Sequence, residues 1–163
     1  MDIMAEKICV IPGTFDPVTN GHLDIIGRAA ELFDKVYAVS FDNSAKKNMF
    51  GPKERLEMLR LACLGFDNVA AEATSQLVAD YAESKKARYI VKGARGAADY
   101  EYEHNMFYIN RELSKNNLET ILFPAKTEHI YISSALVRGL IKYKWDICAY
   151  VPLKVAEFIE NTV

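Results

Sequence analysis

Short apolar segments alternate with longer amphipathic segments along this chain of 163 residues. The apolar segments predict strands at 7–11, 36–41, 68–72, 88–92 and 120–123. The amphipathic segments predict helices at 22–33, 52–66, 76–86, 97–114, 134–143 and 152–160. Strands joined through helices of about ten residues or more make right-handed crossovers, which place the strands in a parallel sheet with helices on both faces. The sequence therefore predicts an α/β fold with a doubly wound, five-stranded parallel sheet in a single domain over 1–163.

The charge balance narrows the choice of ligand. Lys and Arg number 20 against 22 Asp and Glu, a formal net charge of −2, and 50% of the residues are hydrophobic. This composition is typical of an ordinary globular domain. A general nucleic-acid binder needs a large excess of cations to release the counterions of phosphates, so we expect no nucleic-acid partner. A few well-placed cations could still bind a small anion.

The lack of recognisable targeting signals and the pattern of cysteines predict a cytoplasmic protein. Charged residues interrupt every apolar stretch well short of the ~20 residues that a transmembrane helix needs, so we expect no membrane contact. The first residues lack the basic start and apolar core of a signal peptide. The cysteines, Cys9, Cys63 and Cys148, are scattered among apolar residues, which predicts buried reduced thiols in place of a disulfide framework or a zinc site.

The loop after the first strand is the first candidate for a ligand site, because doubly wound folds bind ligands at the carboxyl ends of their strands. Residues 12–22 are rich in Gly, Pro and short polar residues, and they place His22 at a helix start. Free amides and the positive end of the helix dipole attract anions there. Thr14 could donate its hydroxyl to a phosphate oxygen, and His22 could act as a neutral donor. The alternative is a plain turn with an ordinary histidine.

Three other loops after strands add to this candidate site. A lysine pair lies at 46–47, two cations flank small residues within 92–96, and a serine pair lies at 133–134. Each has a simpler interpretation, respectively a solvated surface, a turn and a helix cap. Because the carboxyl ends of parallel strands meet at one edge of the sheet, these loops together favour a nucleoside triphosphate or a similar polyanion.

Several other kinds of site lose support because their motifs are missing from the sequence. The chain has no Gly-x-x-x-x-Gly-Lys-Ser/Thr, Gly-x-Gly-x-x-Gly or Gly-x-Ser-x-Gly, and no His-Glu-x-x-His or Cys-x-x-Cys. P-loop hydrolysis, hydride transfer and zinc catalysis are therefore not expected.

The first loop resembles a known signature. Thr-Phe-Asp-Pro at 14–17 with Gly-His at 21–22 is similar to the Thr/Ser-x-Asp-Pro…Gly-His signature of the nucleotidylyltransferase superfamily. Ile-Ser-Ser at 132–134 resembles its second signature, Ile-Ser-Ser/Thr. The resemblance narrows to the bacterial phosphopantetheine adenylyltransferases through the stretches 12–22, 44–47, 93–95 and 99–103. It runs from about Lys7 to Pro152 and implies a Rossmann-like sheet.

This resemblance implies an activity and a set of partners. The family transfers the adenylyl group of ATP to 4′-phosphopantetheine, which yields dephospho-coenzyme A and pyrophosphate, with Mg²⁺ screening the triphosphate. It also implies a homohexamer and feedback binding of coenzyme A. The aromatic residues of the predicted helix 97–114 exceed what one small core needs, so we expect a self-association face there.

The resemblance further implies roles for individual residues. Catalysis would involve His22, Thr14 and Lys46. ATP would contact Thr14, Phe15, His22, Gly93, Ala94, Arg95, Glu103, His129, Ile130, Tyr131, Ile132, Ser133, Ser134 and Ala135. Phosphopantetheine would contact Thr14, Lys46, Leu77, Val78 and Lys92. Four positions depart from the usual pattern, since similar proteins often have arginine at 92, leucine at 94, an aromatic residue at 129 and serine at 135.

The residues themselves favour direct in-line attack, because no activated Ser, Cys or Lys nucleophile is evident and a phosphate acceptor is already ionised at neutral pH. Two alternatives remain. A related nucleotidylyltransferase could use the same loops on nicotinamide mononucleotide or glycerol phosphate, or the chain could be a nucleotide-sensing module without catalysis.

Overall fold

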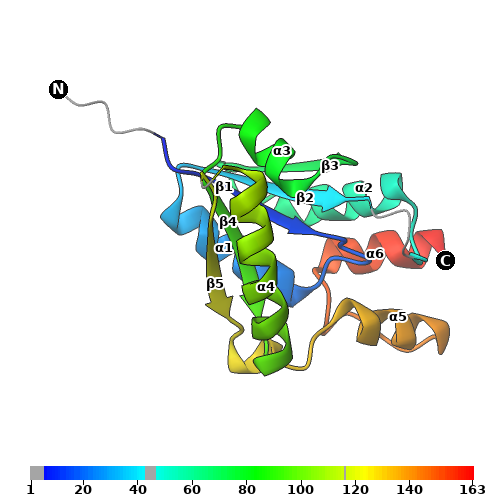
Figure 1. The fold of residues 1–163 in the computed structure, drawn as a ribbon. Coiled ribbons are helices and arrows are strands. Elements are labelled where there is room, and N and C mark those ends of the chain that lie inside the picture. Colours follow the sequence, from blue (N-terminus) through cyan, green and yellow to red (C-terminus); the bar gives the residue numbers. More distant parts are fainter. Residues whose placement is uncertain (1–5, 43–46, 116) are drawn as a thin grey trace.

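The computed structural model describes residues 6–42, 47–115 and 117–163. Its strands form one all-parallel sheet in the order β3-β2-β1-β4-β5 (Figure 1). The strands are β1 (Ile8–Gly13), β2 (Lys35–Phe41), β3 (Val69–Thr74), β4 (Tyr89–Ala94) and β5 (Glu119–Pro124). The helices are α1 (Asn20–Leu32), α2 (Pro52–Cys63), α3 (Val78–Ser84), α4 (Ala97–Leu113), α5 (Ser134–Lys142) and α6 (Leu153–Thr162), with a 3₁₀ turn η1 (Thr127–His129). The predicted fold class is confirmed.

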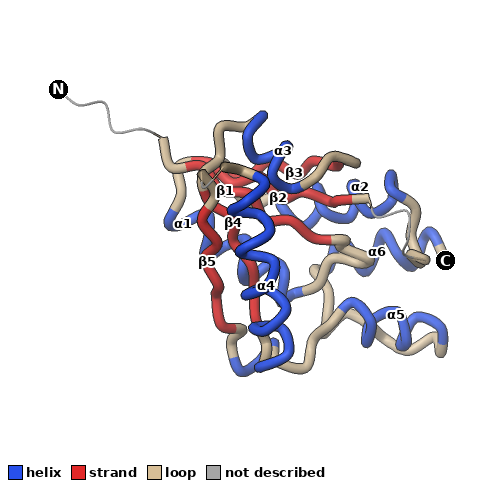
Figure 2. Tube along the Cα trace, viewed as in Figure 1, coloured by secondary structure: helices blue, strands red, loops and turns tan. Residues whose placement is uncertain are grey.

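The strand order reverses beside β1. The chain builds β2 and β3 on one side of β1, and then crosses over to add β4 and β5 on the other (Figure 2). β1 pairs with β2 along its whole length, from Ile8 to Gly13. With β4 it pairs only at Cys9↔Tyr89 and Val10↔Ile90, so the two strands part before their carboxyl ends. This gap is the topological switch point at which such sheets bind ligands.

The two faces of the sheet carry separate cores, as the alternation of side chains along a strand requires. Cys9 and Ile11 of β1 point into the larger core, which is filled by α1, α2 and α6. Val10 points into the smaller core, which α3 covers with Ala79 and Ala82. Helices on both faces bury both sides of β1, and its continuous apolar sequence reflects this.

The structure corrects two expectations. β4 does not end at Gly93 but continues to Ala94, because its ladder with β5 goes on to Pro124. A Cβ at Gly93 would lie 3.0 Å from Cγ1 of Ile25, so the glycine serves the close approach of α1 and not a turn. Cys148 is exposed, whereas Cys9 and Cys63 are buried as expected.

Among the residues described, no helix is both long and apolar enough to cross a membrane.

Candidate active site

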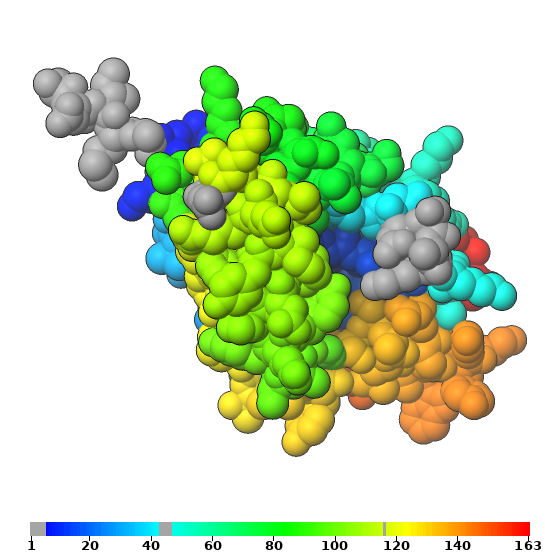
Figure 3. All heavy atoms as spheres, in the orientation of Figure 1, coloured from blue at the N-terminus to red at the C-terminus, as the bar shows by residue number. Residues whose placement is uncertain are grey.

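A cavity of about 710 Å³ opens where β1 and β4 part. Figure 3 shows this side as a hollow between α4 (yellow-green) and α5 (orange), with the blue N-terminal segment at its base. The volume lies within the range of small-molecule sites. Its lining includes most of the predicted ATP-binding residues and Lys92: Thr14, Phe15, His22, Lys92, Gly93, Arg95, Glu103, His129, Ile132, Ser133, Ser134 and Ala135.

Other predicted site residues lie elsewhere. The cavity lining does not include Ala94, Ile130, Tyr131, Leu77 or Val78. Ala94 is buried, whereas Tyr131 is 83% exposed and Leu77 is 60% exposed. Val78 packs against the core under α3. Lys46 lies outside the described residues, and the contacts predicted for all of these residues stay predictions.

His22 is held in one orientation at the start of α1. The side chain of Thr19, the N-cap residue, accepts a hydrogen bond from the His22 amide at 3.4 Å. In return the Thr19 amide donates to Nδ1 of His22 at 3.0 Å. The ring of Phe15 packs edge-on against the imidazole, with 5.0 Å between ring centroids. Because Nδ1 accepts a backbone hydrogen bond, the neutral ring carries its proton on Nε2.

The electrostatic surroundings keep this ring neutral. Burial, together with the positive charges of Lys92 and Arg95, lowers the pKa of His22 to about 4. The positive end of the α1 dipole also opposes protonation. At neutral pH His22 is therefore a fixed neutral donor through Nε2, as the sequence suggested.

Carboxylates of α4 hold the two cations. Nζ of Lys92 lies 3.1 Å from Oε1 of Glu103 and donates to the Pro12 carbonyl at 3.4 Å. Nε of Arg95 lies 3.0 Å from Oδ2 of Asp99. Glu103, which the resemblance assigned to ATP, is the buried residue of α4 and positions Lys92. Each cation is thus fixed at the cavity wall by a carboxylate that an incoming anion must compete with.

Arg95 also reaches the far wall of the cavity. Its Nη1 donates to the carbonyl of Ile132 at 3.3 Å, which ties the start of α4 to the segment before α5. Ser133 is the N-cap of α5 and accepts from the Leu136 amide at 3.1 Å. Ser134 donates to the Pro17 carbonyl at 2.8 Å. Ser134 thus uses its O–H inside the protein, whereas Ser133 accepts and can still donate its own O–H, so a phosphate here would be held by backbone amides of the helix start and by the Ser133 hydroxyl.

Two residues of the site were missed from the sequence. Asp16 is buried, and its carboxylate accepts the amides of Met49 and Phe50, each at 2.9 Å. Arg138 of α5 lines the cavity and donates to the Asp16 carbonyl at 2.6 Å. Arg138 lies four residues after Ser134, one helical turn along the same face, and that spacing could have identified it.

The described part of the cavity wall offers no cluster of side chains that would cage a metal ion. Across 6–42, 47–115 and 117–163, no three His, Cys, Asp or Glu side chains are grouped as metal ligands would be. The carboxylates in the cavity wall, Asp16, Asp99 and Glu103, already accept hydrogen bonds or pair with cations. A metal ion that enters with a polyphosphate would be held by phosphate oxygens and water.

Comparisons with known proteins identify the family and the fold. Residues 10–140 match the Cytidylyltransferase-like family model. The phosphopantetheine adenylyltransferase of Helicobacter acinonychis (strain Sheeba) is 45% identical over 156 residues, 96% of this chain and 99% of that one. Its counterpart from Helicobacter pylori (strain Shi470) is 44% identical over 156 residues, again 96% of this chain and 99% of that one. The structure of Plasmodium falciparum nicotinic acid mononucleotide adenylyltransferase complexed with APC has the same fold, with a TM-score of 0.71, 15% identity and 96% coverage of both chains.

Fold, cavity and family model define a nucleotidylyltransferase of the cytidylyltransferase-like class. Within that class the match at 43–45% identity over nearly the whole chain is decisive. The chain belongs to the phosphopantetheine adenylyltransferase family.

The environment of His22 predicts its titration. In an NMR titration, His22 should stay neutral with the proton on Nε2 down to pH 5 and gain a proton only near pH 4, because burial and two nearby cations oppose its charge. Lys92→Met should raise the pKa of His22 by removing one cation, whereas Lys154→Met, an exposed change on α6, should leave it unchanged. A His22 pKa near 6.5 in the unmodified protein would contradict the assigned environment.

Proposed function

We propose that this protein transfers the adenylyl group of ATP to 4′-phosphopantetheine, forming dephospho-coenzyme A and pyrophosphate in coenzyme A biosynthesis. The observation that carries this proposal is the neutral His22 donor beside Lys92 and Arg95 at the switch point of the sheet. The names of relatives that match nearly the full chain support the choice of acceptor.

The proposed reaction is a direct in-line displacement at the α-phosphorus of ATP. An ionised oxygen of the acceptor phosphate forms the new P–O bond while the bond to the β-phosphate breaks, and pyrophosphate leaves with the electron pair. The acceptor needs no strong base because it is ionised at neutral pH, so alignment and charge stabilisation remain for the protein to supply.

Each site residue has a part in this alignment. Nε2–H of His22 donates to an oxygen of the phosphorus that is being attacked, where preorganised donors stabilise developing charge best. Thr14 and Lys46 assist there, and Arg95 stabilises the departing pyrophosphate. Lys92 binds the phosphate of phosphopantetheine. Its single ammonium replaces the bidentate arginine common in similar proteins, and Glu103 keeps it oriented.

Mg²⁺ enters the proposal as part of the ATP complex. When bound to phosphate oxygens and water, it would screen the negative charge of the triphosphate and of the leaving pyrophosphate. The carboxylates of the cavity wall pair with Lys92 and Arg95 or accept hydrogen bonds from backbone amides.

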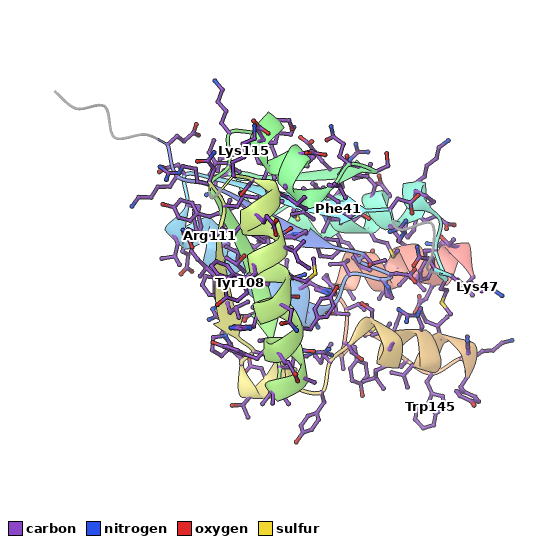
Figure 4. All side chains as sticks on the ribbon, viewed as in Figure 1. Phe41, Lys47, Tyr108, Arg111, Lys115 and Trp145 are labelled. Carbon is purple, nitrogen blue, oxygen red and sulfur yellow. The ribbon has the colours of Figure 1, made fainter. Side chains whose placement is uncertain are left out.

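Assembly and regulation are part of the same proposal. The protein forms a homohexamer, and coenzyme A acts as a feedback ligand at the same cavity, since it shares the pantetheine arm of the substrate. Large apolar residues are exposed on α4, namely Tyr100, Tyr102, Tyr108, Ile109 and Leu113, and they favour self-association through this helix. Trp145, 71% exposed, points away from the body of the molecule and offers a second apolar contact (Figure 4).

The buried free thiols of Cys9 and Cys63 support a cytoplasmic location.

The acceptor assay tests the function. Pyrophosphate release should be measured with MgATP and, in separate reactions, 4′-phosphopantetheine, nicotinamide mononucleotide and glycerol phosphate. We expect release with 4′-phosphopantetheine to exceed release with the other two acceptors by at least about 100-fold. An acceptor that lacks the polar groups of the true substrate leaves buried polar groups of the site without hydrogen-bond partners. Faster release with another acceptor would assign the protein to a different transferase activity. ATP binding without release for any acceptor would favour a nucleotide sensor.

A histidine replacement tests the mechanism. His22→Ala should lower kcat by about 100-fold or more, as loss of an oxyanion donor does, while the Kd for ATP from calorimetry changes little. The matched control is His104→Ala on α4, which removes an exposed histidine outside the cavity lining and should keep kcat. Near-normal turnover of His22→Ala would refute the role given to His22.

A further inference from the structure

A buried cation lies beneath the loop that carries Thr14 and Phe15. Arg55 projects from α2 and is only 1% exposed. Its Nη1 donates to the carbonyl of Thr14 at 3.0 Å and to Oγ of Ser40 at 3.2 Å. Its Nη2 donates to Oδ1 of Asp42 at 2.8 Å, and this third bond keeps the planar guanidinium from rotating away from Thr14.

The Thr14 carbonyl has a second donor. Oγ of Ser40 donates to it at 3.3 Å while accepting from Arg55, so the three groups form a closed set of hydrogen bonds. The residue that follows, Phe15, has a φ of 51°. This left-handed conformation is unfavourable for a residue with a Cβ, so neighbouring contacts must hold it in place. The bonds to the Thr14 carbonyl fix the peptide on one side of Phe15.

The same peptide points its other end toward the cavity. Because a peptide unit is planar and trans, the Phe15 N–H points opposite to the Thr14 carbonyl and therefore away from Arg55. Thr14 and Phe15 both line the cavity. Among the residues described, none accepts a hydrogen bond from the Phe15 N–H. Charged donors on the carbonyl polarise the peptide and strengthen this N–H as a donor.

The fold alone does not call for a charge at position 55. One turn further along α2, the fully buried Met58 fills the same core with an apolar side chain. A buried guanidinium loses its hydration, and Nε of Arg55 has no hydrogen-bond partner among the described residues. Apolar residues commonly replace buried ion pairs without loss of stability, so Arg55 is explained better by what it orients than by what it stabilises.

We propose that Arg55 is a positioning residue for adenylyl transfer. Through the Thr14 carbonyl it orients and polarises the Thr14–Phe15 peptide, so that the Phe15 N–H and the Thr14 side chain face the reacting phosphates. Arg55 itself does not touch the substrate. The kinetic test of this inference rests on the proposed function, whereas its binding test with MgATP does not depend on catalysis.

The kinetic test compares Arg55→Lys with Met58→Ala. Arg55→Lys keeps a buried positive charge but lacks the fork that reaches Thr14 and Asp42 together. It should lower kcat by at least about 10-fold with the KM for ATP within about 3-fold, because misplaced reacting groups cost turnover more than binding. Met58→Ala, a cavity-forming change on the same helix, should lower the melting temperature yet keep kcat within about 2-fold where the protein is folded.

The binding test follows the Phe15 amide by NMR during titration with MgATP. The unmodified protein should show a large downfield shift of this amide proton, and Arg55→Lys should lose more than half of that shift. Ser40→Ala removes a weaker donor to the same Thr14 carbonyl and should lose a smaller part of the Phe15 shift. It replaces Arg55→Lys in this test if Arg55→Lys does not fold.

Two results would overturn the proposal. The first is an undiminished kcat in Arg55→Lys, or in Ser40→Ala if Arg55→Lys does not fold. The other is an undiminished Phe15 shift in the same variant. If the unmodified protein releases no pyrophosphate with phosphopantetheine, the proposed function fails, whereas the Phe15 shift still decides the role of Arg55.

Discussion

The site depends on the early parting of β1 and β4. The two strands share hydrogen bonds only at Cys9–Val10 and Tyr89–Ile90, while β4 continues to Ala94 along β5. Gly93 lets α1 pack closely against β4, which brings the start of α1 and His22 to the opening. A fully paired β1–β4 ladder would leave no room for a ligand at the carboxyl ends. The position of the cavity is therefore set by sheet topology before any catalytic side chain is placed.

Electrostatics at this opening are local and do not follow the net charge of −2. Lys92 and Arg95 lie close enough to His22 to lower its pKa, and carboxylates of α4 hold both cations in place. The same charges thus do two things. They attract phosphates, and they keep the imidazole neutral above about pH 4, so that Nδ1 goes on accepting from the Thr19 amide and the single ring proton stays on Nε2.

Local sequence patterns predicted the sheet, the helices and the loops of the site, because alternating hydrophobicity and loop position determine these features. The neutral donor at His22 could also be predicted, since it follows from a helix start. Arg55 could not, and neither could the role of Asp16, although Asp16 is part of the Thr-Phe-Asp-Pro signature. Their charges are buried by partners far apart in the chain, Thr14 and Ser40 for Arg55 and the Met49 and Phe50 amides for Asp16. Similarly, β4 extends through Gly93 because β5 pairs with it, which no local pattern reveals.

We propose that the protein aligns two phosphates for direct transfer, without an adenylated protein intermediate. The stereochemistry at the α-phosphorus tests it most directly. ATP carrying sulfur at the α-phosphate in one configuration would be turned over with phosphopantetheine, and the configuration of the thiophosphate product determined. Direct in-line attack predicts inversion. Retention would require two successive displacements, and hence a covalent intermediate, and would contradict the proposed mechanism.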